Sequence, residues 1–455
     1  MPRRLRLASA TAAAAALTAG PVIMAAPPAA AAAAKYADDF NGDGYRDYAY
    51  RWWGSTDGGA VKVVFGTATG PGTKTQIIGQ GSKGVPGADE ADDEFGEVRA
   101  AADFDRDGYG DLAVAAPGED VDGKENQGAV TILWGSRTGL SGGTSVANKD
   151  RQSWSAFGRD LATGDFDGDG RPDLAAISGG NTYVYRGAVT RGGKTGAVTE
   201  HDIEGAGFTA DTLTAGKVTK DSATDLVVTG ATVTASGTAT DAWFIRGGST
   251  LQPGRTLRID ARHWASAPSG VIADFDKDGY GDIALGNPEE SGYKGAVTVW
   301  RGGSTGPGTT SQRLTQATSG VAGTPEADDW FGDSLSAADV TGDGCADLAV
   351  GVRGEAIGTV GYAGGVHLFK GGKGGLTGTG SQWFDRGTSG VPGAVRMDDG
   401  FGADVRLRDT DRDGHADLFV SGTEGALRLP GTGSGLTTAG VTRPADNEIV
   451  DGFLQ

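Results

Sequence analysis

Cysteine and histidine are scarce in this chain of 455 residues, which has one cysteine, Cys345, and four histidines. A single cysteine excludes a disulfide framework within the chain, so the fold has to be stabilised in some other way. The histidines have no partner at the spacing of metal ligands, so no histidine metal site is indicated. They are His201, His263, His367 and His415.

Positive charge is also in deficit, because 40 lysines and arginines stand against 59 aspartates and glutamates, a formal net charge of −19. Such an acidic surface repels the phosphates of nucleic acids and the headgroups of anionic lipids. Nucleic acid and membrane surfaces are therefore not expected partners. A set of calcium sites, in contrast, needs an acidic excess of this kind.

No uninterrupted apolar run reaches the roughly 20 residues that a membrane-spanning helix requires. The N-terminus instead combines three arginines with the apolar run Leu7–Leu17 and an alanine-rich stretch that ends near Ala34. This pattern predicts a secretory signal peptide over residues 1–34, with the Sec and twin-arginine routes both open. The mature chain, residues 35–455, is expected outside the cell, either free or associated with the cell wall.

Glycine is abundant, with 81 positions, but it follows no G-X-Y period, which excludes collagen. Valine, leucine and aromatic residues recur at regular places, which excludes simple disorder. So much glycine indicates many tight turns between short strands.

A nine-residue acidic pattern, D-x-[DNT]-x-D-G-x-x-D, recurs along the chain at intervals of 52 to 70 residues when one decayed copy is counted. Two apolar, β-prone runs follow the copies, as in DLAVAAP at Asp111 and GAVTILWG at Gly128. Four copies are preceded by a Phe-Gly pair eight residues upstream, at Phe95, Phe157, Phe331 and Phe401. The six intact copies begin at Asp39, Asp103, Asp165, Asp274, Asp339 and Asp409, and a decayed copy, KVTKDSATD, begins at Lys217.

Each unit therefore holds several short strands with turn signals between them and no helical period. A linear β-solenoid has shorter repeats, and two sandwiches would not give one run of seven units. The sequence predicts an all-β fold, a single seven-bladed β-propeller over residues 35–455.

The acidic loops have the spacing of a calcium site. Carboxylates at positions 1, 3, 5 and 9 and the carbonyl at position 7 can converge on one cation, and glycine at position 6 permits the sharp turn. Oxygen ligands, mostly anionic, favour a hard cation, and a flexible loop favours Ca²⁺ over Mg²⁺. The predicted ligand positions are Asp39, Asn41, Asp43, Tyr45 and Asp47 in loop 1; Asp103, Asp105, Asp107, Tyr109 and Asp111 in loop 2; Asp165, Asp167, Asp169, Arg171 and Asp173 in loop 3; Asp274, Asp276, Asp278, Tyr280 and Asp282 in loop 5; Asp339, Thr341, Asp343, Cys345 and Asp347 in loop 6; and Asp409, Asp411, Asp413, His415 and Asp417 in loop 7.

The decayed fourth loop has Lys217 at position 1, Thr219 at position 3 and Ser222 at position 6. The lysine ammonium would occupy the place of the cation, so no metal is predicted there. The chain is thus expected to bind up to six calcium ions.

Together, the Phe-Gly pair, the acidic loop and the DLAVAAP-like strand resemble the FG-GAP repeats of the integrin α-subunit propeller and the related bacterial VCBS repeats. The resemblance covers residues 36–455 and implies calcium in the loops between the first two strands of a blade. Asn41 and Thr341 depart from the aspartate at position 3, so loops 1 and 6 are expected to bind more weakly. Because the chain shows no other integrin domain, membrane anchoring and signalling are not expected.

A search for catalytic residues is mostly negative. Gly302–Gly306 matches G-x-S-x-G, but Pro307 and Gly308 follow where a nucleophile elbow needs a helix. Cys345 lies inside a metal loop and is expected beside the ion. We therefore expect a non-enzymatic, monomeric binding or adhesion module for an extracellular glycan, polymer or protein. The alternatives are a secreted hydrolase, since FG-GAP repeats also accompany phospholipase D of the glycosylphosphatidylinositol type, and a purely structural protein of the cell wall.

Three near copies, at Gly84, Gly320 and Gly390, join one blade to the next. Because strand connections alternate between the two faces, these junctions and the loops 118–127, 288–294 and 353–363 should lie opposite the calcium loops. Their acidic pairs could form a ligand rim with Trp330, or could be solvated turns that fix the start of a strand. The pairs are Asp92-Asp93, Asp328-Asp329 and Asp398-Asp399.

The two ends of the chain complement each other. Blade 1 begins at its calcium loop and lacks a Phe-Gly strand, whereas Asp451-Gly452-Phe453 near the C-terminus resembles Asp399-Gly400-Phe401. We therefore expect the C-terminal segment to supply the missing strand of blade 1 and close the ring.

Overall fold

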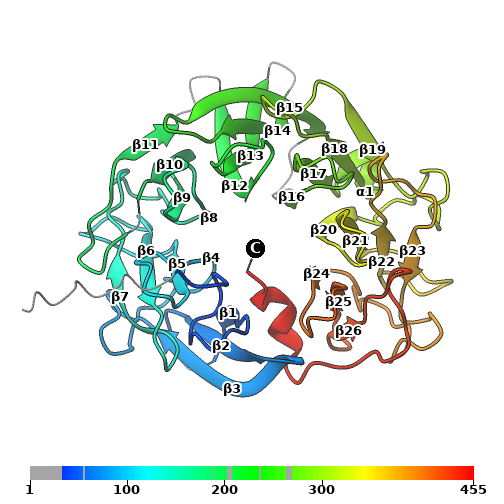
Figure 1. The fold of residues 1–455 in the computed structure, drawn as a ribbon, viewed down its shortest axis with the longest axis horizontal. Coiled ribbons are helices and arrows are strands. Elements are labelled where there is room, and N and C mark those ends of the chain that lie inside the picture. The colour runs from blue at the N-terminus through cyan, green and yellow to red at the C-terminus, as the bar shows by residue number, and fades with distance from the viewer. Residues whose placement is uncertain are drawn as a thin grey trace, which may run out of the picture. The chain divides into compact units, whose positions relative to one another are not determined.

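Seven antiparallel sheets surround a central channel, each with its first strand innermost and its last strand outermost (Figure 1). The computed structural model describes residues 33–54, 57–187, 189–201, 207–234, 237–262 and 269–454. Residues 32–455 form one unit. The predicted leader, residues 1–34, lies almost entirely outside the described residues, and so does His263. The predicted all-β, seven-bladed propeller is confirmed.

Five blades have four strands, and the first and last have three among the described residues. The strands are β1 (Tyr48–Trp52), β2 (Ala60–Thr67) and β3 (Gly70–Gly79) in blade 1; β4 (Arg99–Ala102), β5 (Asp111–Ala116), β6 (Ala129–Trp134) and β7 (Ser141–Ser145) in blade 2; β8 (Leu161–Gly164), β9 (Asp173–Ser178), β10 (Asn181–Tyr185) and β11 (Val198–His201) in blade 3; β12 (Phe208–Gly216), β13 (Asp225–Thr234), β14 (Gly237–Arg246) and β15 (Gln252–Arg262) in blade 4; β16 (Gly270–Ala273), β17 (Asp282–Asn287), β18 (Ala296–Trp300) and β19 (Ser311–Leu314) in blade 5; β20 (Phe331–Ala338), β21 (Asp347–Val352), β22 (Gly365–Phe369) and β23 (Gln382–Phe384) in blade 6; and β24 (Val405–Arg408), β25 (Asp417–Val420) and β26 (Leu427–Leu429) in blade 7.

The second strand of each blade explains the continuous apolar runs in the sequence. In β5, β9, β17 and β21 every residue is buried, because neighbouring blades cover both faces of the strand. An outer strand such as β7 has no buried residue. The apolar alternation of a one-sided sheet is therefore lost in the middle of each blade.

The Phe-Gly pair joins consecutive blades. Phe95 packs in a core cluster with Val61 and Val63 of blade 1 and Leu112 of blade 2, and its side chain is 1% exposed. The glycine that follows has a φ of 97°, and a Cβ on it would lie 2.7 Å from the backbone oxygen of Ala60. The pair thus combines a buried ring with a backbone that approaches the preceding blade too closely for any side chain.

The C-terminal segment closes the ring between blades 7 and 1, as expected, but not as a strand. Residues Asn447–Gly452 form a 3₁₀ helix, η2, beside β1 near the centre (Figure 1). Among the described residues only β2 pairs with β1. Phe453 packs on Tyr48 of blade 1 at 4.9 Å and on Phe419 of blade 7 at 4.6 Å between ring centroids. Its ring therefore takes the inter-blade role of the Phe-Gly phenylalanines, although the backbone that carries it is helical.

Helical structure is otherwise confined to one irregular turn, α1 (Glu290–Tyr293), within the described residues. Ser291 and Gly292 inside it have φ values of 56° and 76°, so it is not a regular helix. None of the helices in the described part of the chain is long and apolar enough to cross a membrane.

Candidate metal centres and the opposite face

In blades 2 to 7 the acidic loops connect the first and second strands, whereas loop 1 precedes β1, the innermost strand of blade 1. The carboxylates of these loops fold the loop backbone. In loop 2, Asp103 accepts hydrogen bonds from the N–H groups of Asp107 and Gly108, both at 3.1 Å. Asp107 in turn accepts one from the N–H of Tyr109 at 3.1 Å. The same three bonds recur in loops 1, 5, 6 and 7. The loops thus share one conformation in which positions 1, 3 and 5 can face a common centre.

The aspartate at position 9 is a structural clamp as well as a predicted ligand. Asp111 accepts from the N–H of Phe104 in its own loop and from the N–H of Gly135 after the third strand, both at 2.8 Å. The decayed loop 4 keeps the clamp, since Asp225 accepts from the N–H groups of Thr219 and Gly247 at 2.8 and 2.9 Å. An equivalent clamp occurs in all seven loops, to the end of the third strand in blades 2 to 7 and to Gly66 of β2 in blade 1. The clamping residues are Asp47, Asp111, Asp173, Asp225, Asp282, Asp347 and Asp417.

Burial opposes the ionisation of these clamping aspartates. It raises the pKa of Asp47 and Asp111 to about 8 and the pKa of Asp173 to about 6, against the pull of their backbone hydrogen bonds. A buried carboxylate near other carboxylates is stabilised when a cation lies beside it.

Four loops bring three carboxylates together, with ligand oxygens within 4.8 Å of one another. Loop 3 fits a metal best. The buried Oδ1 atom of Asp165 has no hydrogen-bond partner, and no lysine or arginine of the described residues forms an ion pair with this loop. Here Asp165, Asp167 and Asp173 would hold Ca²⁺, which would supply the missing positive charge. The four sets are Asp103, Asp105 and Asp111; Asp165, Asp167 and Asp173; Asp274, Asp276 and Asp278; and Asp409, Asp411 and Asp413.

In the other three clusters an arginine pairs with the aspartate at position 3. Arg191 approaches Asp105 to 2.5 Å, and Arg301 approaches Asp276 to 2.6 Å. Arg428 goes further, because it lies 2.5 Å from Asp411 and 2.7 Å from Asp417 and so bridges positions 3 and 9 of loop 7. These guanidinium groups occupy oxygens that a calcium ion would need.

These arginines were not predicted from the sequence, since each lies outside the nine-residue pattern that defines its loop. A signal existed for one of them: Arg301 and Arg246 occupy equivalent places at the end of a third strand, in WRGG and FIRGG. Arg246 pairs with Asp221 of the decayed loop at 2.9 Å.

The remaining loops lack a three-carboxylate cluster among the described residues. In loops 1 and 6, Asn41 and Thr341 stand at position 3, and the weaker binding expected there stays a prediction. In loop 4, the Lys217 ammonium donates to the backbone oxygen of Ser222, across the loop. The calcium ligands of all six loops therefore stay predictions, and loop 3 has the strongest support. The absence of metal in loop 4 also stays a prediction.

The two acids of each pair at the blade junctions have different environments. The second acid of each pair is buried and accepts a backbone N–H: from Glu90 to Asp93 at 2.9 Å, from Glu326 to Asp329 at 2.5 Å, and from Glu424 to Asp399 at 2.7 Å. These three buried acids hold the turns that precede the first strand of the next blade, which is one of the two roles expected from the sequence. The first acids, Asp92, Asp328 and Asp398, are exposed.

The junctions and the loops between second and third strands meet on one face, as expected. The N–H of Phe157 donates to Gln127 at 2.9 Å, and that of Phe401 donates to Ala363 at 3.1 Å, so a loop of one blade is tied to the junction of the next. At the third such contact Trp330 stacks on Tyr293, with centroids 5.2 Å apart, and Arg353 lies 4.0 Å from its ring centre.

The repeats of this chain match a known family of repeats. A profile of the FG-GAP repeat matches residues 84–133, 157–199, 266–300 and 331–369, which contain loops 2, 3, 5 and 6. The chain carries FG-GAP repeats. The suspected resemblance is therefore confirmed for these four segments.

Curated relatives contain matching segments. The chain is 37% identical over 109 residues to mouse phosphatidylinositol-glycan-specific phospholipase D, a match that covers 21% of this chain and 13% of the relative. It is 36% identical over 90 residues to human integrin alpha-10, covering 19% and 7%, and 34% identical over 140 residues to Caenorhabditis elegans integrin alpha pat-2, covering 28% and 10%. This chain thus matches only a small part of each relative.

Two solved structures are also similar. The exotype rhamnogalacturonan lyase YesX has a TM-score of 0.44 at 13% identity, over 88% of this chain and 72% of that chain. The Dos1 propeller has a TM-score of 0.42 at 12% identity, over 70% and 64%. At these TM-scores neither likeness carries an argument about function.

Proposed function

We propose that this protein is an exported, calcium-stabilised FG-GAP propeller that binds an extracellular glycan, polymer or protein and performs no chemistry on it. The observation that carries this proposal is the set of loops on the face opposite the calcium loops. Each of these loops lies between two strands, and hydrogen bonds connect it to the junction of the next blade. Variable loops on a rigid scaffold are the usual place for binding residues.

The aromatic cluster on that face supports a binding role. Trp330 and Tyr293 have φ values of 62° and 63°, a left-handed conformation that costs a large side chain about 1–2 kcal/mol. Gly400 stands at the position equivalent to Trp330 in the next junction, with a φ of 58°. Trp154 on the same face is 68% exposed, and Tyr362 is 47% exposed. Aromatic rings beside exposed acids suit a sugar or a basic peptide.

Calcium is the cofactor in this proposal, with loop 3 as its strongest site. Asp165, Asp167 and Asp173 would hold the ion together with Asp169. The bound charge would relieve the repulsion between carboxylates and stabilise the folded blade by mass action. Export would place the protein where calcium is abundant, and the chain is proposed to be a monomer there.

A hydrolase is the second candidate, because phosphatidylinositol-glycan-specific phospholipase D has a similar segment. A third, a structural protein of the cell wall, would bind no specific ligand. His367, the histidine of the strand β22, gives no support to catalysis, since burial lowers its pKa to about 3. Burial also raises the pKa of the Cys345 thiol, which disfavours the nucleophilic thiolate.

A glycan array and a pull-down from culture medium, both in calcium, would identify a saturable partner. Trp330→Gly removes the ring and relieves the backbone strain, so we expect it to abolish binding without lowering the melting temperature. Arg106→Ala with Lys277→Ala on the calcium face is the matched control and should bind normally. Binding that survives Trp330→Gly and is lost in the control would place the ligand on the other face.

A further inference from the structure

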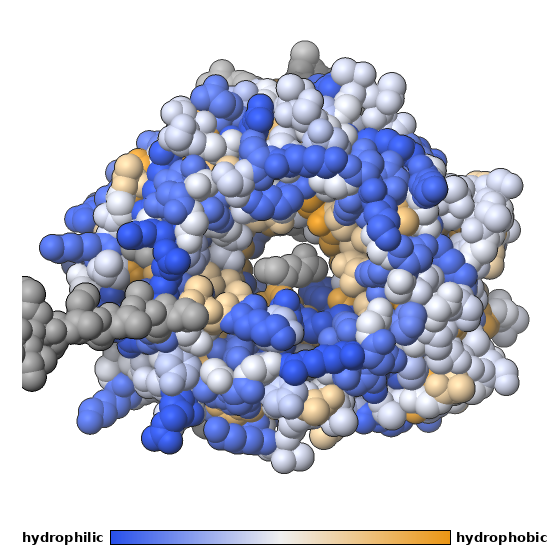
Figure 2. All heavy atoms as spheres, viewed as in Figure 1, coloured by the Kyte–Doolittle hydropathy of each residue, from blue (hydrophilic) through white to orange (hydrophobic). Residues whose placement is uncertain are grey.

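The central channel is a cavity of about 1010 Å³ between the innermost strands of the blades. Figure 2 shows it as the hollow at the centre of the molecule, within a largely hydrophilic surface. Sites for small ligands have volumes of about 300–1,000 Å³, so the channel has room for one.

The charged groups around the channel are almost all paired. Asp333 lies 2.8 Å from Arg353, Asp451 lies 2.7 Å from Arg99, and Arg408 lies 3.0 Å from Asp38. The other acids of the lining also have partners: Glu97 pairs with Arg51, Asp160 accepts the N–H groups of Leu161 and Leu213, and Asp404 accepts the hydroxyl of Ser421.

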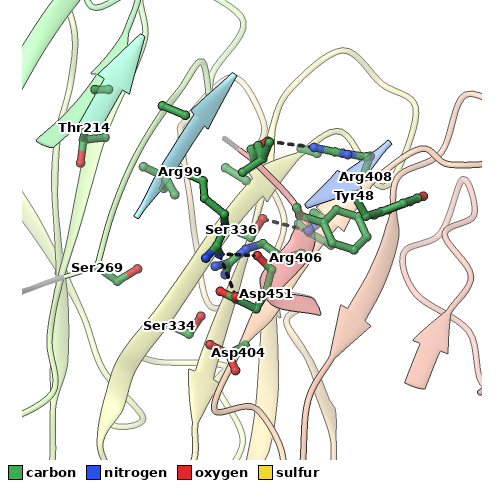
Figure 3. A pocket seen from close by; sticks show the side chains of 18 of the residues that line it. Tyr48, Arg99, Thr214, Ser269, Ser334, Ser336, Asp404, Arg406, Arg408 and Asp451 are labelled. Carbon is green, nitrogen blue, oxygen red and sulfur yellow. Dashed lines mark hydrogen bonds and ion pairs between the residues drawn. The ribbon is translucent and has the colours of Figure 1, made fainter. Parts of the chain in front are cut away.

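Arg412, which is exposed, donates to the backbone oxygen of Gly44 and forms no ion pair among the described residues. The buried exception is Arg406. Its guanidinium donates to the backbone oxygen of Val405 at 2.8 Å, its buried Nε atom has no partner, and no carboxylate of the described residues forms an ion pair with it. Figure 3 shows its head group pointing to the same part of the channel as that of Arg99, next to Asp451. Burial lowers the pKa of Arg406. The charges of Asp404 and Asp451 offset part of this effect. Neither carboxylate forms an ion pair with the guanidinium, so an anion in direct contact with it would add hydrogen bonds that it lacks.

Two hydroxyl groups extend this donor surface. The hydroxyl oxygen of Ser334 accepts the N–H of Val405 at 3.1 Å, and that of Ser336 accepts the N–H of Leu407 at 2.8 Å. Both serines therefore connect blade 6 to blade 7 by hydrogen bonds. Neither hydroxyl donates its own proton to a protein acceptor among the described residues. Both side chains line the channel on β20, beside the strand that carries Arg406 (Figure 3).

We propose that the channel binds a small hydroxylated carboxylate, the chemistry of a uronic acid, beside Arg406. The ligand carboxylate accepts charge-assisted hydrogen bonds from the Arg406 guanidinium. Other oxygens of the ligand accept the hydroxyl protons of Ser334 and Ser336. Asp451 stays with Arg99 and Asp404 stays with Ser421, so the guanidinium of Arg406 keeps its donors for the incoming anion. This site is independent of the rim on the face opposite the calcium loops.

The test is calorimetric titration of the whole mature chain, in calcium, with glucuronate as the probe and glucose as its neutral counterpart. We expect glucuronate to bind and glucose to give no signal. Arg406→Gln should weaken glucuronate binding at least tenfold, because the charge and the paired donors are lost together. Arg159→Gln is the matched control, since it removes one positive charge that does not line the channel, and it should bind normally.

The melting temperatures of the variants show whether a loss of binding comes from unfolding. Arg406→Gln removes an unpaired buried charge, so its melting temperature without ligand should equal or exceed that of the parent. Arg406→Lys, which keeps the charge, provides a second variant and should bind with intermediate affinity. No glucuronate binding by the parent, equal binding of glucose, or unchanged binding by Arg406→Gln would each overturn the proposal.

Discussion

Ring closure by the C-terminal segment can be tested by removing residues 446–455. The segment buries Ile449, Val450 and Phe453, with exposures of 0%, 1% and 4%. At about 1.5–3 kcal/mol for each buried side chain, their burial contributes about 4.5–9 kcal/mol. This is comparable to the total stability of about 5–15 kcal/mol typical of folded proteins.

Truncation also breaks two ion pairs that reach across the closure. Lys62 lies 2.5 Å from Asp446, and Arg99, whose side chain is 7% exposed, lies 2.7 Å from Asp451. Loss of Asp451 would leave Arg99 buried without a carboxylate, which is a destabilising change. We therefore expect the truncated chain to aggregate or to lose cooperative unfolding.

A single substitution measures how much the C-terminal segment contributes to the free energy of unfolding. Phe453→Ala should cost about 3–5 kcal/mol, since the ring packs between Tyr48 and Phe419 and leaves a cavity at the seam. Glu448→Ala, an exposed change in the same helix η2, is the control and should cost less than about 0.5 kcal/mol. Guanidinium unfolding in saturating calcium, followed by tryptophan fluorescence, measures both. A truncated protein as soluble and stable as its parent would refute the closure.

Three further outcomes follow from the loops and the buried acids. Chelation should lower the melting temperature, and Asp167→Ala in loop 3 should remove more of the calcium-dependent part than Asn41→Ala in loop 1; equal losses would contradict the ranking of the sites. Arg428→Ala should destabilise the chelated protein and raise the number of calcium ions bound by one, as counted by native mass spectrometry, whereas an unchanged count would show that Arg428 does not exclude the ion. Burial raises the pKa of Glu119 and Glu355 to about 7, above their unfolded value near 4.3, so the stability they contribute is complete below pH 4.3 and is lost as the pH rises through 7. In saturating calcium the melting temperature should fall from pH 5 to pH 8, and it should fall less in a Glu119→Gln, Glu355→Gln variant; parallel curves would exclude these two groups as the cause.

The repeat pattern predicts the blades well because each one is defined locally. The aspartate at position 9, the apolar run after it and the Phe-Gly pair are all set by sequence neighbours, and each blade buries them in the same way. The prediction that the end of the chain closes the ring rests on the same logic, since Phe453 repeats the role of Phe401.

Two features lay beyond the pattern, for different reasons. The segment before Phe453 is helical although its sequence resembles a strand start, because Asp446 accepts the N–H of Glu448 at 3.1 Å and caps η2. The arginines of loops 2, 5 and 7 reach their aspartates from other parts of the chain. Sequence spacing within a loop specifies which oxygens can converge, but it does not specify which cation reaches them.

The clamp by the position 9 aspartate bears on how such a ring can evolve. Asp225 holds blade 4 together although Lys217 has replaced the first acid of its loop, and Asp417 does the same where Arg428 bridges loop 7. Because the backbone clamp is kept in both blades, a single substitution at another loop position can change the charge of one loop and leave the clamps of the other six intact. Under the proposed function, such a ring could lose or regain calcium sites one blade at a time.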